Sequence, residues 1–203
     1  DARGNKTRDE VNVIPYGKPG KTPWENKDFV PFKFYDIFNE KQMVFRASFK
    51  SLTENITPDW NSVGYLGRPD DLHIYKGVSR DLNMNFVIYP YSYVEFKVLW
   101  AKLNYFTGLA YPSYEKVKGG GERMVAPMIE LSIGDLYKKA PGFIKSMNLS
   151  YDMDATWEIK TGERLPKKID VTCDFITIGK EQWKRDGNHF GFDAKKFNKK
   201  PQG

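Results

Sequence analysis

Residues 67–112 constrain the fold more than any other part of the chain. Their first half alternates apolar and polar residues, and their second half changes to a helical period that stops at Gly108. Strand side chains point alternately to opposite faces, whereas a helix repeats about every 3.6 residues. The stretch therefore predicts a long strand with one dry and one wet face, followed directly by an apolar helix.

The predicted strand ends at Pro90. Its apolar positions are Val78, Leu82, Met84, Phe86 and Ile88, and its polar positions are Ser79, Asp81, Asn83 and Asn85. At about 3.3 Å per residue, a strand of roughly fourteen residues spans about 45 Å, which is long for a globular domain. A long strand with one apolar and one polar face is expected to place its apolar face in the core.

The helix is predicted over residues 92–107. Ser92 followed three positions later by Glu95 is a capping box, and Gly108 is expected just past the end. Its core stripe comprises Phe96, Leu99, Trp100, Leu103 and Phe106. A second apolar stripe runs beside the first, so we expect cover on more than one side of the helix, from a second sheet or a neighbouring subunit.

The remaining elements are predicted to be mostly strands. Strands are expected at 11–14, 29–38, 42–50, 60–65, 125–133, 143–151 and 168–178, and loops at 51–58 and 111–124. The segments 29–38 and 42–50 form a candidate hairpin. The fold class is mainly β with one long helix, as an antiparallel β-sandwich or partial barrel.

The 203 residues divide by composition into three parts. Residues 1–28 are predicted to be an extended arm, 29–179 a β domain, and 180–203 a basic C-terminal arm. The net charge is +6, of which the C-terminal arm supplies +4 and the domain only +1. A uniformly basic nucleic-acid surface is therefore not expected on the domain. The sequence contains no apolar run of about 18 residues, so a membrane-spanning helix is not predicted.

Polar positions recur on two later strands. Ser146 and Asn148 alternate with apolar residues in 143–151, and Lys168, Asp170, Thr172 and Asp174 do so in 168–178. One interpretation is a sheet with one face in water. The other is a sheet whose open edges are joined by further copies into a barrel, whose polar faces line a lumen.

Residues 67–112, with PMIELSIGDLYKKAPGFIKSMNLSYD and LPKKIDVTCDFITIG downstream, form an ordered set of motifs. This set resembles the tail-tube-like baseplate proteins of T-even-like contractile-tailed bacteriophages, over about residues 29–179. The resemblance implies a hexameric ring that initiates or extends the inner tail tube, with no catalysis and no cofactor. The lumen-facing residues it implies are Ser79, Asp81, Asn83, Asn85, Ser146, Asn148, Lys168, Asp170, Thr172 and Asp174.

The resemblance also implies partners and a location. The homo-hexamer would contact adjacent tail-tube or baseplate hub rings, the tape-measure protein, and sheath or baseplate proteins. DNA would pass through the lumen without specific binding. The protein would be assembled in the host cytoplasm and reside in the virion tail.

Two alternatives remain open from the residues. Pro69-Asp70 followed by Glu95-Phe96-Lys97 matches the PD…ExK pattern of Mg²⁺-dependent nucleases, in which two carboxylates and a lysine hold the metal and a water. A capping role for Glu95 and a turn role for Asp70 compete with this interpretation. The second alternative is a nucleic-acid-binding module based on the basic arm 180–203, whose aromatic residues are otherwise expected to anchor it on a neighbouring acidic subunit.

Overall fold

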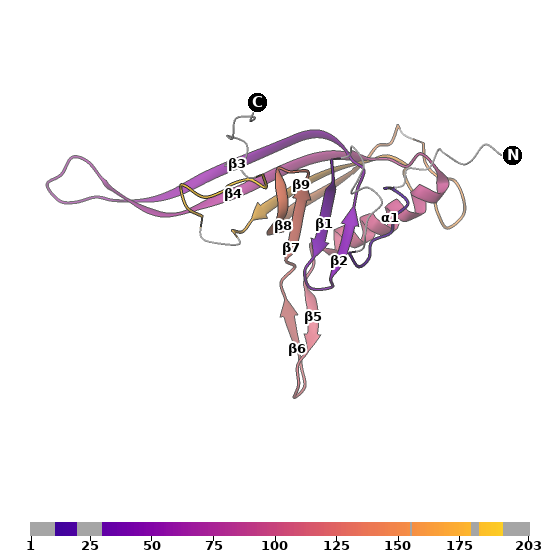
Figure 1. Ribbon diagram of the computed structural model, residues 1–203, viewed down its shortest axis with the longest axis horizontal. Helices are drawn as coiled ribbons and strands as arrows, with labels where there is room; N and C mark the ends of the chain where they lie inside the picture. Colours follow the sequence, from indigo (N-terminus) through magenta and orange to yellow (C-terminus); the bar gives the residue numbers. More distant parts are fainter. Residues whose placement is uncertain (1–10, 20–29, 155, 180–182, 193–203) are drawn as a thin grey trace, which may run out of the picture.

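The computed structural model describes residues 11–19, 30–154, 156–179 and 183–192, which form an antiparallel sheet crossed by one helix (Figure 1). The seven-stranded sheet has the order β2-β1-β7-β8-β9-β4-β3. Its strands are β1 (Phe32–Asp36), β2 (Lys41–Val44), β3 (Ser48–Val63), β4 (Leu72–Ile88), β7 (Ile129–Ile133), β8 (Tyr137–Tyr151) and β9 (Ile169–Thr177). The helix is α1 (Tyr93–Gly108), and β5 (Ser113–Lys116) and β6 (Glu122–Val125) form a separate hairpin.

The predicted long strand is β4, which has 17 residues and pairs with the 16-residue β3. The two strands project together from the body of the molecule (Figure 1). The predicted loop at 51–58 and the short strand at 60–65 are both wrong, because β3 runs through them without interruption. β3 is an edge strand exposed on both faces, so burial does not impose an alternating pattern on its sequence.

The core lies between the sheet and α1. Phe96, Leu99, Leu103 and Phe106 are buried, and Trp100 is half-buried at the margin of the core. The Phe106 ring lies 4.6 Å from Phe34 of β1, 6.5 Å from Phe86 of β4 and 5.7 Å from Phe45, which follows β2, measured between ring centroids. Aromatic pairs at such distances add to the free energy of area burial.

The capping box at the start of α1 is confirmed. The Ser92 hydroxyl donates to the Glu95 carboxylate at 3.1 Å, and the Glu95 backbone N–H donates back to Ser92 Oγ at 3.4 Å. The end of the helix lies one residue beyond the prediction. Gly108 is the last helical residue, and Leu109 is the C-cap in a right-handed conformation.

The helix is flanked by irregular segments, and its outer side, with Lys97, Ala101 and Asn104, is exposed. The described residues contain no separate second sheet packed on the first, but the seven-stranded sheet folds over on itself. Phe32 of β1 lies 5.0 Å from Phe86 of β4, ring centroid to ring centroid, although β7, β8 and β9 separate these strands in the sheet.

One flanking segment is residues 11–19, where a turn replaces the strand predicted at 11–14. Lys102, which is fully buried, donates from Nζ to the carbonyls of Val11 at 2.9 Å, Asn12 at 3.4 Å and Val44 at 2.9 Å.

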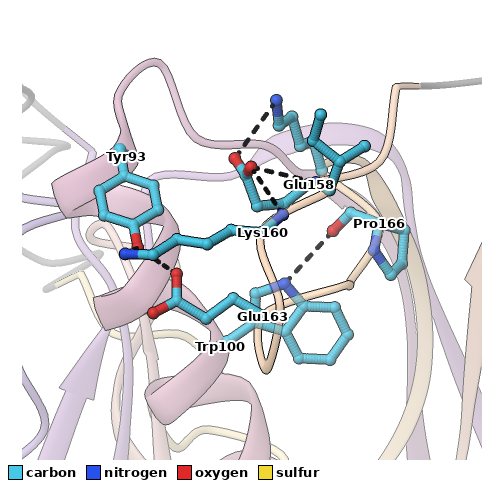
Figure 2. Close-up of polar contacts among 8 residues, drawn as sticks. Tyr93, Trp100, Glu158, Lys160, Glu163 and Pro166 are labelled. Atoms are coloured by element: carbon cyan, nitrogen blue, oxygen red, sulfur yellow. Dashed lines mark hydrogen bonds and ion pairs between the residues drawn. The ribbon is translucent and has the colours of Figure 1, made fainter.

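The second flanking segment follows β8. Trp100 Nε1 donates to the Pro166 carbonyl at 3.2 Å, and the Tyr93 hydroxyl donates to the Glu163 carboxylate (Figure 2). Lys160 donates to the same Tyr93 hydroxyl at 3.0 Å, and Lys97 pairs with Glu163 at 3.0 Å. The hydrogen bond from Tyr93, followed by that from Lys97, lowers the pKa of Glu163.

The loop predicted at 111–124 contains the β5–β6 hairpin, which projects from the body in a different direction from β3 and β4 (Figure 1). Its turn uses the three consecutive glycines 119–121, each with a positive φ. These backbone angles are strained for residues with a side chain. The glycines therefore make a tight hairpin turn.

We expect Lys102→Ala to destabilise the protein by about 2–4 kcal/mol, because it leaves buried carbonyls without a donor. Urea unfolding followed by circular dichroism measures this change. Lys97→Ala, on the exposed side of the same helix, is the matched control and should leave the urea midpoint almost unchanged. Equal losses for both variants would contradict the role of residues 11–19 as a flanking segment held by Lys102.

Candidate functional site

One face of the sheet carries polar side chains across four adjacent strands, β8, β9, β4 and β3. The pairing register aligns Thr53 with Asn83, Asn83 with Asp174, and Asp174 with Ser146. A neighbouring row aligns Ser51, Asn85, Thr172 and Asn148. Residues that pair directly across strands share a face of the sheet. We call this four-stranded surface the polar face.

The residues predicted to face a lumen meet on the polar face, with one exception. Lys168 lies just before β9 and pairs with Asp152 at 2.6 Å. The structure also adds four residues of β3 that were not predicted, namely Ser51, Thr53, Asn55 and Thr57. They were missed because this segment was predicted as a loop. That the polar face lines a lumen stays a prediction.

Asp174 links three strands of the polar face. Its carboxylate accepts hydrogen bonds from the Ser146 hydroxyl on β8 and from the Asn83 amide on β4. These two hydrogen bonds lower the pKa of Asp174, that from Ser146 contributing most. On the opposite face, burial raises the pKa of the Cys173 thiol to about 12, so this thiol is unreactive at neutral pH.

Two lysines reach the polar face from β-bulges. The register shifts between Phe49 and Ser51 on β3 and between Ile144 and Ser146 on β8, which places Lys50 and Lys145 in the bulges. Lys50 pairs with Asp170, and Lys145 lies 3.9 Å from the Asp81 carboxylate. A bulge redirects a side chain that regular alternation would send to the other face. Two carboxylates of the polar face therefore each have a nearby cation.

The polar face ends at an unpaired strand edge on each side. β3 is the last strand of the sheet, and β7 pairs with β8 only as far as Gly142. Among the described strands, residues 143–151 of β8 therefore have β9 as their one neighbour. Unpaired edges present rows of free backbone donors and acceptors and readily pair with another chain.

The projecting part of the β3–β4 hairpin carries apolar side chains in contact with water. Ile56, Trp60, Ile74 and Tyr75 are each about half exposed. Trp60 and Tyr75 pack edge to face with ring centroids 5.1 Å apart. Exposed apolar patches of this kind mark interaction surfaces.

Arg80 lies where the hairpin leaves the body of the molecule. Its guanidinium is buried, pairs through Nε with Glu54 of β3, and donates from Nη1 to the His189 carbonyl at 2.6 Å. The rings of Tyr137, Trp183 and Phe190 lie 5.1–5.7 Å from the guanidinium carbon. The described part of the C-terminal arm, residues 183–192, therefore packs on its own chain; the other residues of that arm lie outside the described residues.

The candidate nuclease residues do not come together. Asp70 pairs with Arg68 in the loop at the tip of the β3–β4 hairpin, whereas Glu95 and Lys97 lie on α1 at the other end of the molecule (Figure 1). Glu95 is buried and serves as a cap, accepting from the Tyr91 N–H at 3.0 Å. Within the described ranges, no three His, Cys, Asp or Glu residues gather as metal ligands, and no helix is suited to cross a membrane.

Comparisons with known proteins give a likeness in structure but none in sequence. No protein-family model matches the chain, and no curated protein matches it. The chain is similar to a solved structure named "Tail of empty GTA particle computed with helical refinement, C6 symmetry". The sequence identity is 14%, the TM-score is 0.36, and the match covers 76% of this chain and 95% of the other. At this TM-score the likeness supports no conclusion about function.

We expect the stabilising effect of Asp174 to depend on pH. The folded-state pKa is lower than that of an unfolded aspartate, so the stabilisation is complete above the unfolded value of about 3.9 and is lost as pH falls through the folded value. Urea unfolding of the protein and of Asp174→Asn should therefore differ at pH 7, and the difference should shrink as the pH falls below about 3.9. Asp71→Asn, in the exposed loop after β3, is the control, and a constant difference at all pH values would contradict the assignment.

We expect Arg80→Leu to destabilise the protein by about 3 kcal/mol, because it leaves Glu54 without its partner in a largely buried ion pair. Chemical unfolding measures this loss. Arg123→Leu breaks the exposed cross-strand pair with Glu115 and should cost less than about 1 kcal/mol. A loss for Arg80→Leu no larger than that of Arg123→Leu would show that the buried contacts contribute little.

Proposed function

We propose that the protein is a structural subunit of a phage-type tail tube, and that copies join edge to edge into a ring whose lumen is lined by the polar face. The observation that supports this proposal best is the pair of unpaired edges, on β3 and on residues 143–151 of β8, at the two sides of one polar-faced sheet. A ring removes both edges at once, because the β3 of one copy pairs with the β8 of the next.

The strand directions are compatible with this closure. β8, β9, β4 and β3 are antiparallel to their neighbours, so β3 and β8 at the two edges run in opposite directions. When copies are related by rotation about one axis, β3 therefore meets the next copy's β8 in antiparallel orientation. The ring is a continuous antiparallel barrel whose polar residues point inward.

The number of subunits, six, and the role at the baseplate come from the resemblance of residues 29–179 to tail-tube-like baseplate proteins. The partners implied by that resemblance, namely adjacent rings and the tape-measure protein, are part of the same proposal. So are the passage of DNA through the lumen and the location in the virion tail. The protein acts without catalysis, since its work is symmetric assembly.

Cysteine cross-linking tests the edge pairing. Thr53→Cys is combined in turn with Ser146→Cys, Asn148→Cys or Ser150→Cys. In one chain β9 and β4 separate β8 from β3, and three strand spacings of about 4.8 Å exceed the reach of a disulfide. We therefore expect cross-links between copies only, as a ladder on denaturing gels that ends at the hexamer in the register that pairs.

The control combines Thr53→Cys with Asn104→Cys on an exposed position of α1 and should give no ladder. Cys173 is buried and takes no part. Absence of cross-links in every register, together with a monomer in light scattering at all concentrations, would reject the ring. A ladder that ends at another number would correct the symmetry but keep the edge pairing.

A further inference from the structure

A cavity of about 360 Å³ lies between the start of β8 and residues 183–192. Its charged and titratable lining residues are Arg80, Lys138, Lys139, Lys184 and His189, with the Tyr137 ring beside them. No aspartate or glutamate is among the described residues that line it. The volume is within the range of about 300–1,000 Å³ typical of ligand sites, and the lining favours a negatively charged occupant.

Arg80 supplies a buried donor in this cavity. Its side chain is 5% exposed, Nε is paired with Glu54, and Nη1 is bonded to the His189 carbonyl. Nη2 is buried and has no hydrogen-bond partner. Buried donors without an acceptor are rare because desolvation is costly, so an oxygen acceptor from a ligand would complete this group.

Aromatic side chains form another part of the wall. Trp183 and Phe190 line the cavity, and both remain more than a third exposed. Rings that are partly in water offer apolar area to an entering side chain at little further entropic cost. The site combines cations, one buried guanidinium donor and exposed aromatic rings. It is suited to a short peptide segment whose side chains carry carboxylates on aliphatic groups.

The position of the cavity indicates what kind of molecule supplies the carboxylates. Arg80 alternates with Asp81 along β4 and lies in the same row as Leu82 and Met84, so the cavity opens on the side opposite the polar face. In the proposed ring, on which this step rests, that side is the outside. A nucleic acid in the lumen does not reach the cavity, whereas a protein that packs around the ring does.

We propose that this cavity binds an acidic peptide segment of a protein that surrounds the ring, with one carboxylate accepting from Arg80 Nη2. Lys139 and Lys184 hold further carboxylates of the same segment by charge. The occupant is thus a protein ligand of the outer surface, distinct from the neighbouring copies that pair with β3 and β8.

Isothermal titration of the full chain with a blocked peptide of alternating aspartate and glutamate tests the proposal. We expect saturable binding that weakens about tenfold or more in the double variant Lys139→Glu with Lys184→Glu. The matched control, Lys116→Glu with Lys118→Glu, makes the same charge change on and beside β5 and should bind as the unmodified chain does. Inorganic phosphate is titrated in parallel.

Three results would overturn the proposal. They are no binding of the peptide, equal weakening in both double variants, and phosphate that binds at the Lys139 and Lys184 site while the peptide does not. Ring formation is scored separately by cross-linking in each variant. Rings without peptide binding would remove the cavity's role alone, whereas site-specific binding without rings would remove the proposed function and keep the cavity as an acidic-peptide site.

Discussion

The structure depends on a mismatch between one helix and a large sheet. A single helix, α1, packs against one face of the curved seven-stranded sheet, and residues 11–19 and 156–167 flank the helix on the same side of the sheet. The uncovered face must therefore be polar, or it would aggregate. The buried row Leu82, Met84 and Phe86 and the polar row Asp81, Asn83 and Asn85 are two results of this single constraint.

Burial decided which parts of the fold could be predicted from the sequence. β4 and β9 have one buried face, so their sequences alternate and both were predicted, as was α1 with its cap at Ser92. β3 is exposed and stabilised by backbone pairing to β4, and its alternation over residues 51–58 is weak because Glu54 and Pro58 interrupt the apolar positions Leu52 and Ile56. The sequence predicted that a second sheet or a neighbouring subunit would cover α1. The segment that packs beside the helix was not predicted, because it is held by hydrogen bonds from Lys102 to carbonyls far away in sequence.

The polar face likewise contains residues that could be predicted from the sequence and residues that could not. The polar residues of β4, β8 and β9 could be named from alternation, because each alternates with apolar residues that are buried on β4 and β9 and partly buried on β8. Lys50 and Lys145 could not, since a bulge breaks the alternation from which a face is inferred. Arg80 did leave a signal, a charged residue in an apolar row, and its partners Glu54 and His189 became apparent only in three dimensions.

The two ends of the molecule along its long axis differ, and this difference affects how a tube of stacked rings would lengthen. In the proposed ring all copies point the same way, so one rim bears the hairpin side chains Trp60 and Tyr75. The other rim bears Tyr91 and Ile159, which lie near the start of α1 and after β8 and are 64% and 83% exposed. Two unlike rims can stack only head to tail, which makes the resulting filament polar. A polar filament has two ends with different rates of addition, so a single chain would encode the direction in which the tube lengthens.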